Sequence, residues 1–333
     1  MEDSEWLSFH LYYHEDLLRP IQGFVRPAVV DLLPPGKISR FFFVRYGLGG
    51  PHLRLRLQPQ RGAREEVRDR VEKHALAFLA STPSQASLTR EAIEDATRSI
   101  LQSDPDETDE TLYPDNWFQS AIFRPETNRY GGAAFLEASL DFFAISSLEA
   151  LVFLHRYATE PRSRQLPRIF RLLLRQTFGF AANPEEFGHL LRYAEISWAE
   201  NFPRAAAKAD SAFERQRDIF ASLFEEEARD RYRPDSTPDT VLLESARSLG
   251  RATRSLDTDH RWVIGGSQLH MTANRLGVSN PEEVYLSRLL SLTWLHLQTK
   301  QSNGAAPGTD TDATFDSEAK RRWIKVKLSE LTQ

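Results

Sequence analysis

Hydrophobic and polar positions alternate with a period of two in the first part of the chain, a pattern typical of β-strands. Three segments are predicted strands, residues 6–13, 38–46 and 52–58: the first and third alternate, and the second is strongly apolar. The last two flank a glycine-rich turn, which predicts a hairpin. Between the first two, residues 15–33 have helical spacing that Pro20 and Pro27 interrupt, so we expect a broken helix there.

The period changes to that of an α-helix after residue 131. We predict helices over residues 133–157, 162–178, 184–201, 205–232, 238–256, 261–276 and 281–300, with an earlier one over 62–81. Residues 111–124 read as strand and loop. Because the strands are confined to roughly the first 125 residues, they are expected to pair antiparallel. The predicted fold class is α+β, with an N-terminal antiparallel sheet and its helices followed by a mostly helical C-terminal part.

The same pattern predicts the domain organisation. We expect residues 1–300 to form one domain. Residues 301–315 are small and polar, which indicates a flexible linker or loop. Residues 316–333 return to helical spacing and predict a terminal helix.

Composition limits the chemistry that is available. The 333 residues include no cysteine, which excludes disulfides, thiolate nucleophiles and cysteine-ligated metals. A net charge of −5 argues against a surface devoted to nucleic acid. The start lacks the form of a signal peptide, and no apolar run approaches the ~20 residues of a membrane helix. We therefore expect a soluble, cytoplasmic protein without a membrane partner.

Several common site patterns are missing from the sequence. His10, His14 and Glu15 do not have the spacing of metal ligands, so no metal site is expected. No glycine-rich loop ends in Lys-Ser or Lys-Thr, and no Gly-x-Ser-x-Gly element is present. Nucleotide triphosphate binding and serine-hydrolase chemistry are therefore not indicated.

The strand predicted at 52–58 carries the first candidate site. His52, Arg54 and Arg56 alternate with leucines and would share one face of the strand, at about 6.6–7 Å spacing. One interpretation is a half-buried strand whose polar face meets water. The other is a binding face, because the planar fork of arginine suits a carboxylate and arginine is costly to bury without an anion.

A second candidate lies just before the long helical region. Glu126 and Arg129 are three residues apart and precede Tyr130 and a pair of glycines. One interpretation is a local ion pair at a helix start, with the glycines forming the turn. In the other, the glycines let the backbone approach a ligand.

A third candidate lies on the helix predicted at 261–276. His270 and Asn274 are four residues apart and share a face, in an apolar setting. A single histidine there is commonly a satisfied core residue. The alternative is a general acid or base, because the unperturbed pKa of histidine lies near working pH.

Taken together and in this order, the segments resemble the C-terminal small domain of class I lanthipeptide dehydratases and its stand-alone relatives in thiopeptide biosynthesis. The resemblance spans about residues 5–300. It is carried by residues 6–13, 41–46, 52–56, 124–132 and 269–276.

The resemblance implies that the chain eliminates glutamate from glutamylated Ser or Thr of a ribosomally made precursor peptide, leaving dehydroalanine or dehydrobutyrine. It places the catalytic residues at Arg56, Glu126, Arg129 and His270. Among them, His270 is the candidate for proton transfer and Glu126 for orienting Arg129. We expect the neighbouring residues of the same segments to bind substrate: His52, Arg54, Tyr130, Asn274 and Arg275.

The resemblance also implies partners and cofactors. The ester would be made by a separate large subunit that uses glutamyl-tRNA, so this chain would not contact nucleic acid itself. No cofactor or metal is required. We expect the arginines and His270 to converge around one anion-sized cavity.

Two alternatives stay open from the sequence. Related stand-alone proteins of thiopeptide pathways join two dehydroalanines in a formal [4+2] cycloaddition and expel the leader peptide. Retention of the Arg, Glu and His set favours elimination, because no glutamate leaves in the cycloaddition. The other alternative is a non-catalytic scaffold that binds leader peptide at the edge of the predicted sheet.

Overall fold

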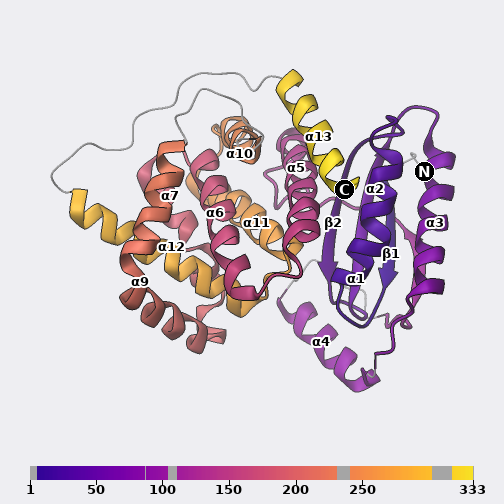
Figure 1. Cartoon of the computed structure of the whole chain (residues 1–333), viewed down its shortest axis with the longest axis horizontal. Coiled ribbons are helices and arrows are strands. Elements are labelled where there is room, and N and C mark those ends of the chain that lie inside the picture. The colour runs from indigo at the N-terminus through magenta and orange to yellow at the C-terminus, as the bar shows by residue number, and fades with distance from the viewer. Residues whose placement is uncertain (1–5, 87, 104–110, 231–240, 302–316, 333) are drawn as a thin grey trace. The chain divides into compact units, whose positions relative to one another are not determined.

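The structure, a computed structural model, describes residues 6–332 except 87, 104–110, 231–240 and 302–316. The chain forms two compact units (Figure 1). The first comprises Met1–Pro125, Ala150–His155 and Lys327–Gln333, and the second comprises Glu126–Glu149 and Arg156–Val326. The predicted linker at 301–315 lies almost wholly outside the described residues. The division at residue 300 stays a prediction.

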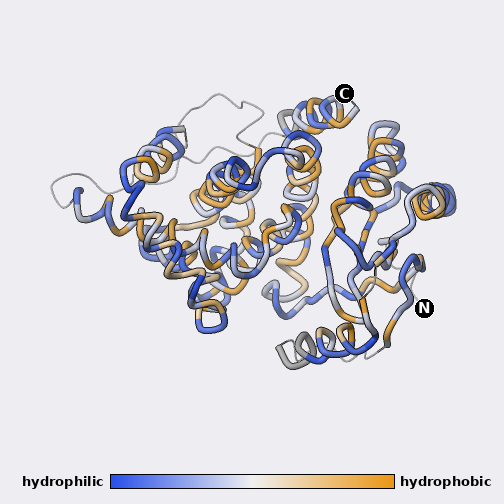
Figure 2. Tube along the Cα trace, turned by 60° about the horizontal axis from the view of Figure 1, so that its bottom comes forward, coloured by the Kyte–Doolittle hydropathy of each residue, from blue (hydrophilic) through white to orange (hydrophobic). Residues whose placement is uncertain are grey.

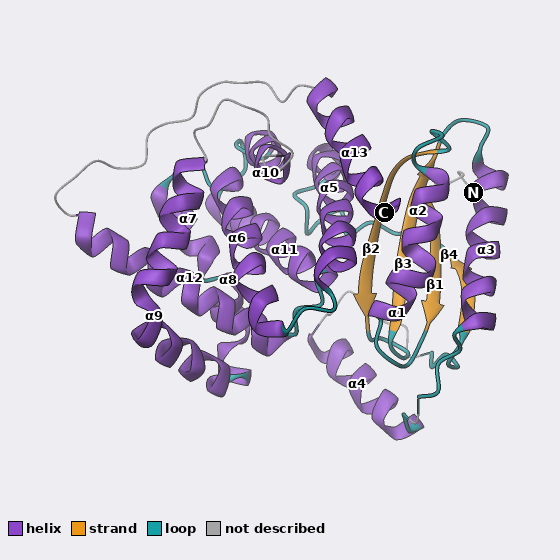
Figure 3. Cartoon of the chain, in the orientation of Figure 1, coloured by secondary structure: helices purple, strands orange, loops and turns teal. Residues whose placement is uncertain are grey.

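The first unit is built on a four-stranded sheet with the order β2-β3-β1-β4 (Figure 3). Its strands are β1 (Leu7–Tyr12), β2 (Ile38–Tyr46), β3 (His52–Pro59) and β4 (Trp117–Ala121). All three strand pairs are antiparallel, and β2 and β3 form the predicted hairpin. The α+β fold class predicted from the sequence is confirmed.

One face of this sheet is apolar and covered by helices. The helical segments of this region are α1 (Leu18–Pro20), the π-helix η1 (Ile21–Val25), α2 (Arg26–Leu32) and α3 (Arg64–Ser81). Phe24 of η1 packs edge-on against Phe118 of β4, which stacks on Phe9 of β1. The π-helix accounts for the break that Pro20 and Pro27 predicted.

Helix α4 (Arg90–Ser103) was not predicted from the sequence. Its apolar residues Ile93, Ala96, Ile100 and Leu101 recur at helical spacing, so the sequence carried a signal for this helix that the prediction passed over. The backbone N–H of Gly49, in the β2–β3 turn, donates to the Thr97 hydroxyl on α4 at 3.0 Å. This bond ties α4 to the turn that precedes β3.

The second unit is helical. Its elements are α5 (Ala133–Tyr157), α6 (Arg162–Phe180), α7 (Pro184–Leu191), α8 (Tyr193–Trp198), η2 (Ala199–Asn201), α9 (Pro203–Asp230), α10 (Val241–Ala252), α11 (Thr258–Arg275), α12 (Asn280–Gln301) and most of α13 (Ser317–Thr332). Apolar and polar stretches alternate along these helices (Figure 2). α13 lies where the terminal helix was predicted. The predicted end of the helix at 205–232 and start of the one at 238–256 fall outside the described residues.

The single helix predicted over 184–201 is wrong, because the structure has three segments there. The chain bends at Arg192, and the bend lays the Tyr193 ring on α11. A side chain at Gly266 would approach that ring to 1.9 Å, so only glycine allows the contact. Tertiary packing between α8 and α11 therefore overrides the helical period of this segment.

Helix α5 is long and apolar enough to cross a membrane by length and composition, which the sequence reading did not anticipate. Within the protein, 72% of its most apolar window is buried. That burial is typical of the central helix of a folded core.

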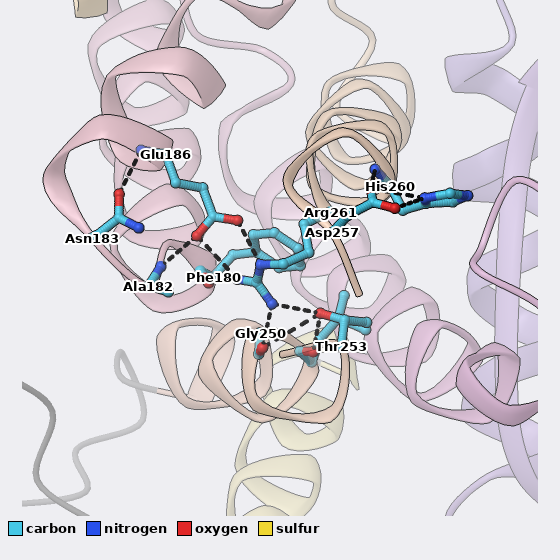
Figure 4. Close-up of polar contacts among 10 residues, drawn as sticks. Phe180, Ala182, Asn183, Glu186, Gly250, Thr253, Asp257, His260 and Arg261 are labelled. Atoms are coloured by element: carbon cyan, nitrogen blue, oxygen red, sulfur yellow. Dashed lines mark hydrogen bonds and ion pairs between the residues drawn. The ribbon is translucent and has the colours of Figure 1, made fainter. Parts of the chain in front are cut away.

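The start of α11 is anchored by a buried arginine (Figure 4). The Arg261 guanidinium pairs with the Glu186 carboxylate of α7 through contacts of 2.7 and 3.0 Å. It also donates to the Gly250 carbonyl of α10 at 2.7 Å, to Thr253 Oγ1 at 3.0 Å and to the Phe180 carbonyl of α6 at 3.2 Å. One side chain thus links α11 to three other helices of the unit.

Candidate functional site

The predicted site residues belong to two groups, one in each unit. His52, Arg54 and Arg56 lie on β3 in the first unit. The others lie in the second unit, in the segment before α5 and on α11: Glu126, Arg129, Tyr130, His270, Asn274 and Arg275. The convergence of the two groups in one cavity stays a prediction.

The polar face of β3 is largely removed from water. His52 has no exposed surface and Arg56 is 7% exposed, so the interpretation of a water-facing strand is wrong. The register places His10 of β1 opposite Arg54, and Tyr12 of β1 opposite His52. Aromatic side chains from neighbouring segments therefore cover the histidine and confine the arginines.

His52 fixes the position of Arg54. Its Nδ1 lies 2.8 Å from the Gly50 carbonyl oxygen and must donate to it, which leaves Nε2 as an acceptor. Arg54 Nε donates to that Nε2 at 3.1 Å. The guanidinium lies 3.6 Å from the centre of the Tyr46 ring, a cation–π contact. Arg54 is thus held on two sides.

Arg56 lies in an aromatic box. Its guanidinium is 5.9 Å from the centre of the Phe42 ring and 5.6 Å from that of Phe123. Trp6 packs edge-on against both phenylalanines. The box excludes water from one side of the charge, which strengthens its attraction for an anion.

The electrostatics of this face favour neutral histidines and positive arginines. Burial, together with Arg56 and His52, lowers the pKa of His10 to about 2. Burial and the neighbouring Arg54 lower the pKa of His52 to about 3. Both rings are therefore uncharged at neutral pH, and the positive charge of the face comes from Arg54 and Arg56.

These lowered pKa values predict that acid destabilises the protein. Below pH ~6.5 the unfolded chain protonates His10 and His52, whereas the folded protein does not until the pH approaches 3. Stability is therefore lost as the pH falls, by about 1.4 kcal/mol per pH unit for each histidine. Urea denaturation at pH 7, 6 and 5 measures this slope. A His10→Asn variant should have a shallower slope, and equal slopes for the two proteins would contradict the assignment.

In the second unit, Glu126 and Arg129 form the predicted local ion pair. Arg129 Nε lies 2.9 Å from Glu126 Oε2, and the two side chains are 36% and 48% exposed. The turn that follows uses Gly131 and Gly132 at φ values of +79° and +98°. A side chain at Gly131 would meet Leu256 at 2.7 Å. The glycines therefore form a tight turn that packs on the helical core and presents Arg129 at its rim.

Tyr130 and Arg275 lie beneath this pair. Tyr130 is 5% exposed, and burial followed by the charge of Glu126 raises the pKa of its hydroxyl. Arg275 has no exposed surface; it lies 4.7 Å from the centre of the Phe143 ring and donates to the Ser146 hydroxyl at 3.0 Å. Burial lowers the pKa of Arg275 to about 9, so it stays charged. Direct contact of Arg275 with a substrate would require this core to open.

His270 faces a buried carboxylate. Its Nδ1 lies 2.9 Å from Glu283 Oε2 on α12, and its ring lies 4.8 Å from that of Trp198. The His270 side chain is 26% exposed and that of Glu283 is 5% exposed. Asn274, one turn further along α11, is partly buried. His270 is therefore not a fully buried core residue.

The hydroxyl of Tyr193 is affected by charged residues near both predicted segments of this unit, the one before α5 and the one on α11. Burial raises the pKa of its hydroxyl and the negative charge of Glu283 raises it further, whereas a hydrogen bond with Ser267 and the charge of Arg129 act against this. Tyr193 is thus within electrostatic range of both the Glu283–His270 pair and Arg129. Tyr193 and Glu283 also line one small cavity.

Sequence reasoning missed Glu283 and Tyr193. Glu283 occupies the first turn of a helix, where an acidic side chain is expected for its effect on the helix dipole. Tyr193 was placed inside a helix that does not exist. The glycine pair at 265–266 was the available signal, because adjacent glycines in a helix often mark a close approach.

In the part of the chain that the structure describes, no group of three or more His, Asp or Glu side chains has an arrangement that fits a metal ion.

A protein family matches most of the chain. A family described as the C-terminal part of lantibiotic biosynthesis dehydratases matches residues 6–294. The chain belongs to this family. The match includes all of the residues in the two groups above. A comparison with curated proteins gives no match.

Solved structures of related fold include two thiopeptide or lantibiotic enzymes. A pyridine synthase from thiomuracin biosynthesis, TbtD, superposes with a TM-score of 0.72 at 19% identity, over 89% of this chain and 99% of TbtD. The tRNA-dependent lantibiotic dehydratase MibB from Microbispora sp. 107891 gives 0.55 at 19% identity, over 91% of this chain and 29% of MibB. TsrL gives 0.56 at 15% identity, over 88% of this chain and 95% of TsrL. At these identities the likeness shows the fold.

Proposed function

We propose that this member of the lantibiotic dehydratase family is an eliminase, which removes glutamate from glutamylated Ser or Thr of a precursor peptide. The observation that carries the proposal is a candidate proton-transfer group, His270, hydrogen-bonded to Glu283, which lines one small cavity together with Tyr193. The charge of a cation, Arg129, acts on the same tyrosine. β-Elimination needs both: a group that moves the α-proton and a positive charge for the departing carboxylate.

The cationic face of the sheet supports the same proposal. Arg54 and Arg56 present two guanidiniums beside neutral histidines. Each charge-assisted hydrogen bond to a glutamate carboxylate contributes on the order of 1.5–3 kcal/mol. In this proposal these arginines bind the glutamyl group, and Glu126 orients Arg129.

The partners follow from the reaction. The glutamyl ester has to be made by another activity, and the fold of this chain corresponds to 29% of the tRNA-dependent MibB. We propose that a separate large subunit charges the precursor peptide with glutamate taken from glutamyl-tRNA. The precursor peptide is then the substrate of both proteins. The proposed location of both is the cytoplasm.

Loss of glutamate from a glutamylated precursor peptide is the test. The purified chain is mixed with such a peptide and the products are followed by mass spectrometry. We expect glutamate to be released and dehydroalanine or dehydrobutyrine to appear. A His270→Ala variant should leave the adducts in place. If the variant releases glutamate as fast as the unchanged chain, His270 is not the proton-transfer group. If the unchanged chain releases no glutamate and forms no ring product, it serves as a binding scaffold.

A pyridine synthase is the second candidate. It is favoured by the superposition with TbtD over 99% of that protein. In the same experiment, a fully dehydrated peptide is supplied in a parallel reaction. A ring product with release of the leader peptide, without loss of glutamate in the first reaction, would replace the eliminase proposal by this one.

A further inference from the structure

We propose that Glu283 is a positioning residue that holds His270 as a general base, an inference that rests on the eliminase function proposed above. The two residues come from neighbouring helices, His270 from α11 and Glu283 from α12. Their contact joins imidazole Nδ1 and carboxylate Oε2 at 2.9 Å.

The contact selects one tautomer of the imidazole. An ionised carboxylate only accepts hydrogen bonds, so Nδ1 must carry the proton and donate it to Glu283. The lone pair of the neutral ring then lies on Nε2. Among the residues that the structure describes, Nε2 has no hydrogen-bond partner, and the His270 side chain is 26% exposed. The nitrogen that can accept a proton is therefore the one that Glu283 does not occupy, on a side chain that is partly exposed.

In this proposal His270 acts as the base. In the proposed step, Nε2 takes the α-proton of the esterified residue. The electron pair of the Cα–H bond becomes the Cα–Cβ double bond, and the Cβ–O bond breaks with its electrons on the glutamate carboxylate. The imidazolium that forms is stabilised by Glu283, whose carboxylate is 5% exposed and poorly screened by water.

The neighbouring Glu282 shows that Glu283 is not needed for capping α12. Glu282 Oε2 accepts from the backbone N–H of Ser279 at 3.0 Å, and its carboxylate pairs with Arg162 at 2.7 Å. Glu282 thus satisfies the helix start, whereas Glu283 points inward to His270. Glu282 and Glu283 are adjacent on one helix turn but make different contacts. A substitution at Glu282 is therefore a matched control for one at Glu283.

Two aromatic side chains, Tyr193 and Trp198, complete the surroundings of the His270–Glu283 pair. Tyr193 of α8 is influenced by Glu283 and by Arg129, which precedes α5. The Trp198 ring packs against His270 at 4.8 Å between ring centres and restricts its rotation. Glu283 is thus the group that hydrogen-bonds to the imidazole, and the others limit its surroundings.

Glu283→Gln tests the proposal by kinetics. The substitution conserves volume and removes the charge, so it should fold. We expect kcat for glutamate elimination to fall roughly 10–100-fold, as for other groups that orient a reactive histidine, with KM changed less than about twofold. Glu283→Asp should recover part of the loss, and Glu282→Gln should keep the wild-type kcat. A Glu283→Gln variant with wild-type kcat overturns the proposal.

A second measurement does not depend on activity. Nitrogen-15 NMR of the histidine-labelled chain, assigned with a His270→Ala variant, reports which ring nitrogen carries the proton. We expect the Nδ1–H tautomer in the unchanged chain; an Nε2–H tautomer overturns the proposal even if elimination occurs. If the chain shows no elimination but His270 is the Nδ1–H tautomer, the eliminase function fails while the orienting role of Glu283 stands.

Discussion

Arg129→Ala is expected to leave glutamyl adducts accumulating on the precursor peptide, with elimination about 10²–10³ slower than in the unchanged chain. The Arg129 side chain is 36% exposed and pairs locally with Glu126, so the fold should not depend on it. What is lost is a positive charge that acts on Tyr193 and that, in the proposed reaction, stabilises the departing glutamate carboxylate. Mass spectrometry of the peptide over time measures the rate.

Arg56→Ala is expected to have the same effect from the other group of site residues. This side chain is 7% exposed in its aromatic box, so thermal unfolding of the variant has to be measured alongside activity. Arg217→Ala is the control for Arg129→Ala. Arg217 also forms an exposed ion pair with a glutamate three residues before it, Glu214 on α9. If the Arg56 and Arg129 variants both dehydrate the peptide normally, the glutamate-binding role is wrong.

Arg261→Met is expected to lower the free energy of unfolding by about 3–5 kcal/mol, the largest stability effect predicted for a single side chain. The substitution leaves the Glu186 carboxylate buried at 5% exposure without its cation. It also removes the donor to two backbone carbonyls, those of Gly250 and Phe180 (Figure 4). Urea denaturation followed by tryptophan fluorescence measures the change.

Arg68→Ala provides the comparison for this stability effect. Arg68 pairs with Glu65 at the surface of α3, where the two side chains are 39% and 72% exposed. Exposed pairs contribute about 0–1 kcal/mol, so this variant should be nearly as stable as the unchanged chain. Equal losses of unfolding free energy in the two variants would show that burial does not increase the contribution of the Arg261–Glu186 pair to stability.

Local features of the site could be predicted from the sequence. Alternation alone assigns His52, Arg54 and Arg56 to one face of β3, because the strand period is two. The pairing of Glu126 and Arg129 follows from their spacing of three. These predictions succeed because the contacts depend on neighbours in the chain.

Other features depend on distant segments and could not be predicted. His52 is buried because Tyr12, Tyr46 and the rest of the sheet surround it, and its own segment does not indicate this. Glu283 meets His270 because α11 and α12 pack together, although either residue alone has an ordinary explanation. The bend between α7 and α8 depends on the space above Gly266.

Strand β3 carries core leucines and the arginines of the candidate site on alternate positions. A one-residue slip in its pairing with β1 and β2 would turn the guanidiniums toward the helices and the leucines outward. Such a misaligned chain would lose its core together with its cations. Correct alignment of the arginines is therefore enforced by folding itself, and mispaired molecules should be cleared as unfolded protein rather than persist as inactive enzyme.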